Sequence, residues 1–267
     1  MAEITYSGAA APPARRAGKM AKRGLDTLLV IVGILVIWQG LHWLAGDVAI
    51  TAPAATLAHL FELMGSGPRF WRHVEETGLA FGQAMGIALA GGVLIGLTLG
   101  GSRLAAEVFE PILVAIYSLP KITLYPVILL IFGLGMQAKV AFGVIHGIIP
   151  VAIFTMNAVR NMRPIYMRAA RSMRLNWAQR AGYVLIPAAL PEIVSGLRIG
   201  FALTLLGVLI GELFASQRGL GFLLLRAMER NDVPTILALA VFLFTIAAVV
   251  SWALLKFERS IHHRNED

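Results

Sequence analysis

The chain has 267 residues, of which 58% are hydrophobic and only 14% are charged, yet its formal net charge is +8. Ordinary globular proteins carry roughly 25% charged residues, and a soluble fold this apolar would leave large hydrophobic patches exposed. The composition therefore excludes a disordered chain and an ordinary nucleic-acid-binding domain, and the absence of cysteine excludes disulfides and thiolate metal sites.

Six stretches are apolar enough to cross a bilayer, whose core of about 30 Å needs roughly 20 helical residues. They are residues 27–46, 77–102, 111–138, 141–159, 193–215 and 233–255. The third stretch is interrupted by Lys121, and the fifth by Arg198 and Glu212. We therefore predict an all-α, polytopic membrane protein with six transmembrane helices, the first of which occupies residues 25–46.

The N-terminal residues 1–24 are basic, rich in small residues and without an apolar run. A cleaved signal peptide needs an apolar core, so we expect a disordered cytoplasmic segment followed by an uncleaved anchor. With the N-terminus inside, the inner segments hold most of the 23 lysines and arginines. The positive-inside rule then predicts that both termini are cytoplasmic.

The second stretch carries a pattern of glycines spaced four residues apart. They are Gly78, Gly82, Gly86, Gly92, Gly96 and Gly100. At about 100° per residue they share one helix face, and small residues allow another helix to approach closely. This pattern favours tight packing within one bundle, with a dimer seam as the alternative.

The third stretch contains Lys121 between Pro120 and Pro126, which predicts a break or kink at its middle. A lysine there is costly in hydrocarbon and should face protein or water. Two interpretations remain open. The lysine lines a permeation path and attracts an anion, or its long side chain reaches an interface or satisfies carbonyls that the prolines leave free.

The longest inner loop, residues 160–191, reads as an amphipathic helix-turn-helix. Pro164 is well placed to begin a helix, and Pro187 and Pro191 are expected to end the helix that follows. One face is apolar, with Tyr166, Ala169, Ala170, Met173 and Trp177, whereas Arg168, Arg171 and Arg174 lie on a flank. Such a face must dock against the anionic inner leaflet or against another protein.

At this loop the sequence resembles a known family. Residues 168–174 (RAARSMR), followed by VLIP at 184–187, resemble the loop of bacterial ABC importer permeases. The stretches LPKITLYP at 119–126, FGLG at 132–135, SGLRIG at 195–200 and GLG at 219–221 are similar to the branch that transports nitrate, sulfonates and taurine. The similarity covers about residues 25–260.

The resemblance implies a type I ABC importer permease bundle in the bacterial inner membrane, with a permease core at 77–258. Two copies, expected to be a homodimer, would pair with two ATPase subunits that bind ATP and Mg²⁺, and a periplasmic or lipid-anchored binding protein would deliver the substrate. The loop at 160–191 would contain a cytoplasmic coupling helix seated in a groove of the ATPase. The implied coupling residues are Arg168, Ala169, Ala170, Arg171, Met173, Arg174, Leu175 and Pro187, with Ala169 and Ala170 in the groove and Pro187 setting the angle back toward the membrane.

Two residues depart from the family's loop pattern. Its acidic first position is Arg168 here, and its glycine position is Arg174. Because a glycine turn exploits the missing Cβ, we expect a differently shaped turn around Leu175 and Asn176, since asparagine tolerates left-handed geometry. We also expect the ATPase to present acidic residues to Arg168, Arg171 or Arg174.

Two further residues are candidates for the translocation path. Glu212 lies near the outer end of the fifth span, where it forms either an outer gate with Arg218 or a solvated ion pair of little energetic value. His146 is the intramembrane histidine, and it is either a pore residue or a packed, hydrogen-bonded side chain. There is no Gly-rich phosphate loop, no metal-ligand spacing in the membrane and no catalytic set. We therefore expect a chain that is not an enzyme and binds no metal or cofactor itself.

The leading interpretation is thus the permease subunit of an ABC importer for a small anion such as nitrate, a sulfonate or taurine. A permease for a heterocyclic vitamin precursor is an alternative within the same class. An ion-gradient-driven secondary transporter is the alternative from another class, but it would more often show paired intramembrane acids and internal repeats. A membrane enzyme is disfavoured because the sequence lacks a convergent catalytic set.

Overall fold

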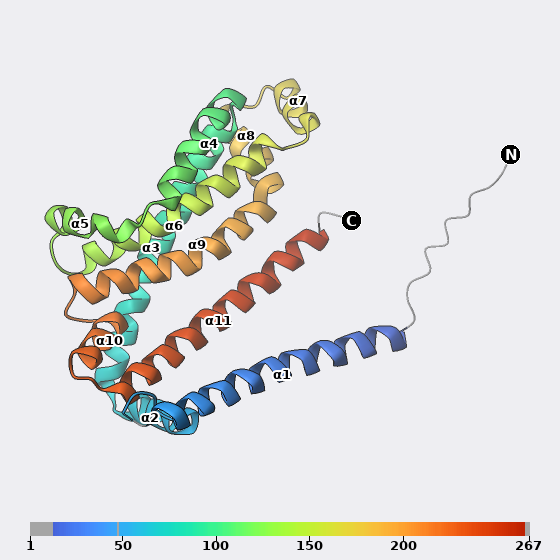
Figure 1. The fold of residues 1–267 in the computed structure, drawn as a ribbon. Helices are drawn as coiled ribbons and strands as arrows, with labels where there is room; N and C mark the ends of the chain where they lie inside the picture. The colour runs from blue at the N-terminus through green and yellow to red at the C-terminus, as the bar shows by residue number, and fades with distance from the viewer. Residues whose placement is uncertain (1–12, 47, 265–267) are drawn as a thin grey trace.

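The computed structural model describes residues 13–46 and 48–264, and every element in those ranges is a helix (Figure 1). Five helices are long and apolar enough to span a membrane: 26–45, 68–100, 136–160, 177–215 and 233–259. A bent helix pair over 103–132 supplies the sixth candidate span. The predicted all-α membrane fold is therefore confirmed, while the cytoplasmic placement of both termini stays a prediction.

Helix α1 (Pro13–Ala45) begins earlier than the sequence predicted. Residues 13–24, for which the sequence predicts disorder, continue this helix, since alanine, arginine, lysine and methionine are good helix formers; residues 1–12 lie outside the described residues. Helix α1 stands apart from the bundle and meets α2 (Pro53–Gly65) near its C-terminal end (Figure 1). There the Trp38 indole N–H donates to the carbonyl of Thr51 at 3.1 Å.

Three helices form the centre of the bundle: α3 (Pro68–Gly100), α6 (Met136–Arg160) and α9 (Ile186–Ala215). The glycine face of α3 divides into two halves. A Cβ at Gly92 would lie 2.7 Å from Cβ of Val151, and one at Gly100 would lie 2.6 Å from the carbonyl oxygen of Met156, so this half packs tightly on α6. The other half meets nothing within 4 Å of an added Cβ and comprises Gly78, Gly82 and Gly86. Tight packing within the bundle therefore explains half of the pattern.

The predicted span 111–138 is not one helix. The structure divides it among α4 (Arg103–Ser118), a 3₁₀ turn (Lys121–Leu124), α5 (Tyr125–Phe132) and the first residues of α6. The chain bends by 83° between α4 and α5, which confirms the predicted break. Pro120 lacks an N–H and forces Leu119 into an extended conformation, so α4 must stop there.

After α6 come α7 (Pro164–Ser172), α8 (Trp177–Arg180), a π-helical segment (Ala181–Leu185) and α9. The predicted helix start at Pro164 is confirmed. The prediction that Pro187 and Pro191 end a helix is wrong, because α9 runs through both and the span extends over 39 residues from Trp177. Pro187 stands in the first turn of α9, where a missing N–H costs little, after the π-helical segment has shifted the hydrogen-bond register.

The chain ends with α10 (Leu220–Glu229) and α11 (Val233–Arg264). Helix α10 folds beside the beginning of α3, at the end of the bundle opposite to α7 (Figure 1). Phe70, Leu220 and Leu239 form a small buried core that joins α3, α10 and α11. The bundle thus presents two distinct ends, one built around α7 and the other around the turn into α10.

Candidate functional site

The turn after α7 is built on a left-handed arginine. Arg174 has φ 49°, and the N–H of Leu175 donates to the carbonyl of Ala170 at 3.1 Å, which closes a Schellman-type end. The expected turn around Leu175 and Asn176 is wrong, because the left-handed residue sits at the family's glycine position. Asn176 instead caps α8, where its Oδ1 accepts the N–H of Gln179 at 2.8 Å.

Helix α7 turns one part of its apolar face inward and leaves the rest exposed. Ala170 is fully buried within the chain, so the prediction that it packs into a partner's groove is wrong for the chain in this conformation. Met173 and Ile165 remain 69% and 64% exposed, and Ala169 is also exposed. Because this loop lies outside the long apolar part of the spans, large exposed apolar side chains mark a surface that needs a partner.

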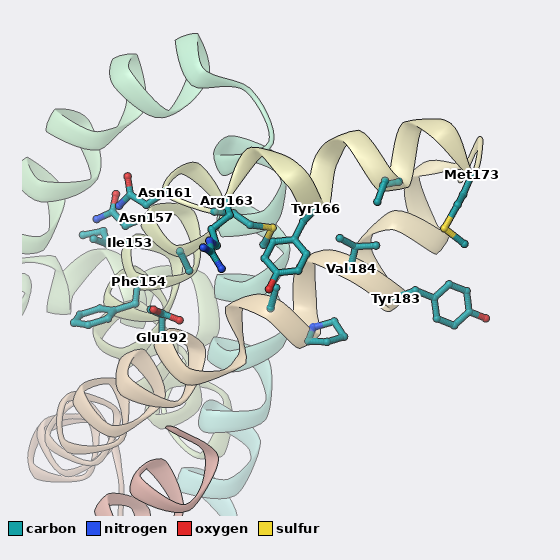
Figure 2. A pocket seen from close by; sticks show the side chains of 16 residues that line it. Ile153, Phe154, Asn157, Asn161, Arg163, Tyr166, Met173, Tyr183, Val184 and Glu192 are labelled. Carbon is teal, nitrogen blue, oxygen red and sulfur yellow. The ribbon is translucent and has the colours of Figure 1, made fainter. Parts of the chain in front are cut away.

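A cavity of about 800 Å³ opens between α7, the end of α6 and the beginning of α9 (Figure 2). Ala169, Ala170, Met173 and Pro187 all line it, together with Tyr183. Four of the eight predicted coupling residues are thus brought together around one cavity. Arg171 lines a different cavity on the other side of α7, while Arg168, Arg174 and Leu175 line neither.

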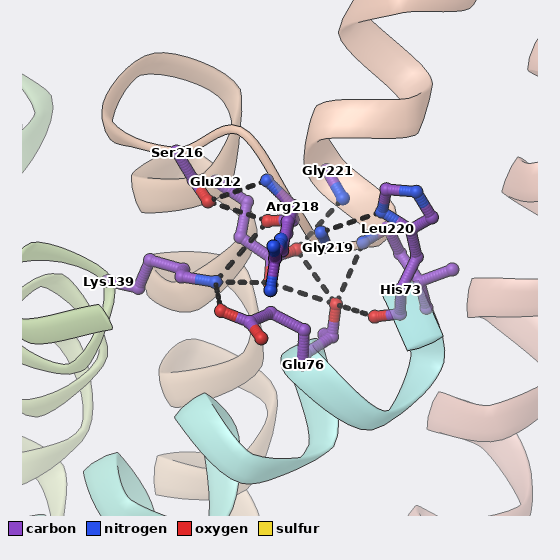
Figure 3. A network of polar contacts seen from close by, with 10 residues as sticks. His73, Glu76, Lys139, Glu212, Ser216, Arg218, Gly219, Leu220 and Gly221 are labelled. Atoms are coloured by element: carbon purple, nitrogen blue, oxygen red, sulfur yellow. Dashed lines mark hydrogen bonds and ion pairs between the residues drawn. The ribbon is translucent and has the colours of Figure 1, made fainter. Parts of the chain in front are cut away.

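At the opposite end of the bundle, a buried polar cluster joins α3, α6 and α9 (Figure 3). Lys139 and Glu212 are both fully buried. The Lys139 ammonium donates to Glu76 Oε1 at 2.9 Å and to the carbonyl of Arg218 at 3.3 Å, and it lies 3.7 Å from Glu212 Oε1. One ammonium therefore serves two carboxylates that come from different helices.

The Glu212 carboxylate also holds the turn into α10. The Thr77 hydroxyl lies 2.9 Å from both carboxylate oxygens, and the N–H of Gly221 donates to Oε2 at 2.9 Å. The N–H of Leu220 donates to the Thr77 oxygen at 2.8 Å. Gly219 has φ 117°, and any Cβ there would collide with the carboxylate, so this position requires glycine.

This geometry corrects the expectation for Glu212. It is not a solvated partner of Arg218, because its carboxylate is fully buried, residues 216–221 fold back over it, and Arg218 contacts Lys139 through its backbone carbonyl. No local sequence pattern singles out Lys139, Glu76 or Thr77. The available signal was that Glu76, Lys139 and Glu212 each lie at the same end of a span, as they would if they met in the fold.

The other two path candidates also have partners within the chain. The Lys121 ammonium donates to the carbonyl of Tyr117 at 2.8 Å, so it satisfies a carbonyl left free where α4 ends. His146 Nδ1 lies 2.8 Å from the carbonyl of Phe142, and Gly207 of α9 packs against its ring. The geometry therefore favours a lysine that satisfies a free carbonyl at Lys121, and a packed, hydrogen-bonded side chain at His146. Lys121, His146 and Glu212 share no hydrogen-bond partner.

The fold and its two ends define a class: a polytopic helical membrane protein with an amphipathic helical hairpin between two of its central spans. Residues 88–263 match the sequence model of the family described as binding-protein-dependent transport system inner membrane component. The chain belongs to this family.

Relatives over most of the chain carry consistent names. A probable ABC transporter permease protein of Haemophilus influenzae is 29% identical over 248 residues, which cover 91% of this chain and 100% of that protein. The taurine transport system permease protein of Escherichia coli K12 is 26% identical over 86% of this chain and 87% of its own length. A riboflavin transport system permease protein of Chloroflexus aurantiacus is 29% identical, with 89% and 91% coverage.

The fold also matches a solved transporter. A chain of the MetNI methionine ABC transporter in an inward-facing conformation superposes with a TM-score of 0.54 at 21% identity, covering 72% of this chain and 93% of that one. The protein is thus an inner-membrane permease subunit of an ABC importer. Members of this family work with a separate ATPase subunit and with a substrate-binding protein.

Proposed function

We propose that two copies of this chain form a homodimeric permease that imports a small anion such as nitrate, a sulfonate or taurine. The resemblance of residues 119–126 and 132–135 to that branch supports this substrate class, as does the taurine permease among the relatives. ATP and Mg²⁺ bind to the partner ATPase, and this chain holds no cofactor. A periplasmic or lipid-anchored binding protein selects the substrate.

The α7 hairpin is the proposed contact with the ATPase, and the observation that carries this proposal is its exposed surface. Met173 and Ile165 are apolar and largely exposed, and Arg168, Arg171 and Arg174, on the flank of the same hairpin, are exposed as well. An apolar centre with a charged rim is the anatomy of a protein interface. Ala170 and Pro187 do not belong to this exposed surface. They line the cavity between α7 and the rest of the bundle, where they set how α7 is positioned.

In this arrangement, ATP-driven movement of the ATPase shifts α7, and the continuous helix from Trp177 to Ala215 carries the movement across the membrane. The left-handed turn at Arg174 fixes the angle between α7 and α8. Lys121, His146 and Glu212 serve as framework residues on this proposal, because each already has a partner within the chain.

Charge reversal tests the coupling contact. Arg168→Glu combined with Arg174→Glu should reduce both co-purification of the ATPase and ATP-driven uptake, and a reversal of acidic residues on the ATPase should restore them. Arg230→Glu, on an exposed arginine at the other end of the bundle, is the matched control for the change in net charge. Unchanged assembly and uptake in the double variant would rule out the electrostatic contact.

A heterocyclic vitamin precursor is the second candidate substrate, because the riboflavin permease is as similar to this chain as the first relative. Calorimetric titration of the cognate binding protein with taurine, nitrate and pyrimidine or flavin compounds separates the two classes. Affinity for the anions alone supports the proposed substrate, and affinity for the heterocycles alone replaces it.

A further inference from the structure

A second cavity, of about 640 Å³, lies on the other side of α7 from the one in Figure 2. The end of α3, the beginning of α4, the end of α6 and α7 surround it. Three arginines from three different helices line this cavity, Arg103, Arg160 and Arg171, together with Glu107. Of the residues that line this cavity, only Arg171 also belongs to the proposed contact with the ATPase.

The cavity keeps an excess of positive charge. Arg103 Nε lies 3.0 Å from Glu107 Oε1, but both side chains are more than half exposed, so this pair contributes little and can rearrange. Arg160 Nη1 donates to Glu110 Oε2 at 2.5 Å. Arg171 has no ion-pair partner among the residues that the structure describes. With two carboxylates for three guanidinium groups, the cavity is suited to an anion.

An apolar stripe begins at the rim of this cavity. Leu104, Val108 and Ile112 follow one another at four-residue spacing along α4 and are 71%, 50% and 46% exposed. They extend for about 12 Å at 1.5 Å per residue, away from the arginines and toward the centre of the span. A cationic cavity at the end of an exposed apolar stripe is complementary to an anionic phospholipid. The cavity matches the charged head group, and the stripe matches the hydrocarbon chains.

We propose that this cavity binds the phosphate group of an anionic phospholipid whose acyl chains lie along α4. The planar guanidinium forms paired hydrogen bonds with phosphate oxygens, and basic pockets between transmembrane helices bind anionic head groups. Glu107 pairs with Arg103 and Glu110 pairs with Arg160, so the lipid phosphate supplies the third negative charge, the one that Arg171 lacks. Because Arg171 belongs to α7, the bound lipid joins the α7 hairpin to α4 and α6.

Native mass spectrometry of the intact transporter, purified with its ATPase, tests the proposal. The complex is equilibrated with equal amounts of phosphatidylglycerol and phosphatidylcholine, and the retained lipids are compared. Each basic residue near the head group is worth about fivefold in affinity, so Arg103→Gln with Arg171→Gln should lower the preference for phosphatidylglycerol about 30-fold. Arg69→Gln, which removes an exposed arginine at the other end of the bundle, should leave the preference unchanged.

The single variants Arg171→Gln and Arg171→Lys distinguish a loss of lipid binding from a folding defect. The first should lose about fivefold, and the second should keep most of the preference because it keeps the charge. A double variant that retains phosphatidylglycerol as the wild type does would overturn the proposal. So would displacement of the lipid by millimolar inorganic phosphate, because the cavity would then be a site for a soluble anion.

Discussion

Replacing Lys139 by methionine tests whether the buried polar cluster holds one end of the bundle together. Methionine keeps most of the side-chain volume but removes the ammonium that contacts Glu76 and lies 3.7 Å from Glu212. Glu76 has a side chain that is 25% exposed and can turn to water, whereas Glu212 is fully buried and cannot. The variant therefore leaves a buried carboxylate without its counter-charge.

Removing one partner of a buried ion pair costs about 3–5 kcal/mol. For a chain of this size each kcal/mol shifts the melting temperature by about 2–4 °C, so Lys139→Met should lower the Tm by about 10 °C. Adding Glu212→Gln should recover a large part of the loss. Glutamine is uncharged, and its carbonyl oxygen can still accept from Thr77 and Gly221.

The assay is thermal unfolding of the detergent-purified protein, monitored by circular dichroism and by loss of monodisperse protein. Lys256→Met is the matched control, because that lysine is exposed and lies over the Trp252 ring. Its Tm should stay within about 2 °C of the wild type. If Lys139→Met also stays within that range, or if the double variant melts no higher than the single one, the buried ion pair does not stabilise this end of the bundle.

Three further predictions follow from close packing and local geometry. Gly96→Leu should lower stability by about 3 kcal/mol or more, because its side chain meets α6, whereas Gly82→Leu should change it little; equal Tm values would contradict the helix seam. Arg174→Gly should stabilise the α7 hairpin by up to about 1 kcal/mol by relieving the left-handed arginine, seen as slower hydrogen exchange over residues 164–176; faster exchange would contradict it. Lys121→Met should lower the Tm, because the bond to a carbonyl is lost, without changing the ratio of uptake rates for nitrate and taurine. A changed ratio would indicate that Lys121 lines the translocation path.

The sequence predicted the fold well where one physical requirement dominates. Long uncharged runs must be helices in a bilayer, because every backbone polar group needs a partner there. Residues 111–138 were harder to predict, because the apolar run continues across a bend caused by Pro120 and across the turn at Gly133 and Gly135. A long apolar run shows that its residues lie in the membrane, but it does not show where one helix ends and the next begins.

Of the candidate sites, the α7 hairpin could be predicted from the sequence, whereas the polar cluster around Lys139 could not. Its partners are Glu76, Arg218 and Glu212, which lie 63 to 79 residues away in the chain, so no local pattern brings them together. The α7 hairpin is local, and its helix start and exposed apolar face followed from residue spacing. The burial of Ala170 did not, because it depends on how α7 folds against the beginning of α9.

The central claim is that this permease moves solute only when it is joined to an ATPase and supplied by a binding protein. Uptake of radiolabelled taurine or nitrate into proteoliposomes measures this directly, with the permease reconstituted alone and in the complete complex. We predict uptake that requires ATP, the ATPase and the binding protein, that vanadate blocks, and that the permease alone does not support. Uptake by the permease alone under an ion gradient, with no effect of ATP, would contradict the account.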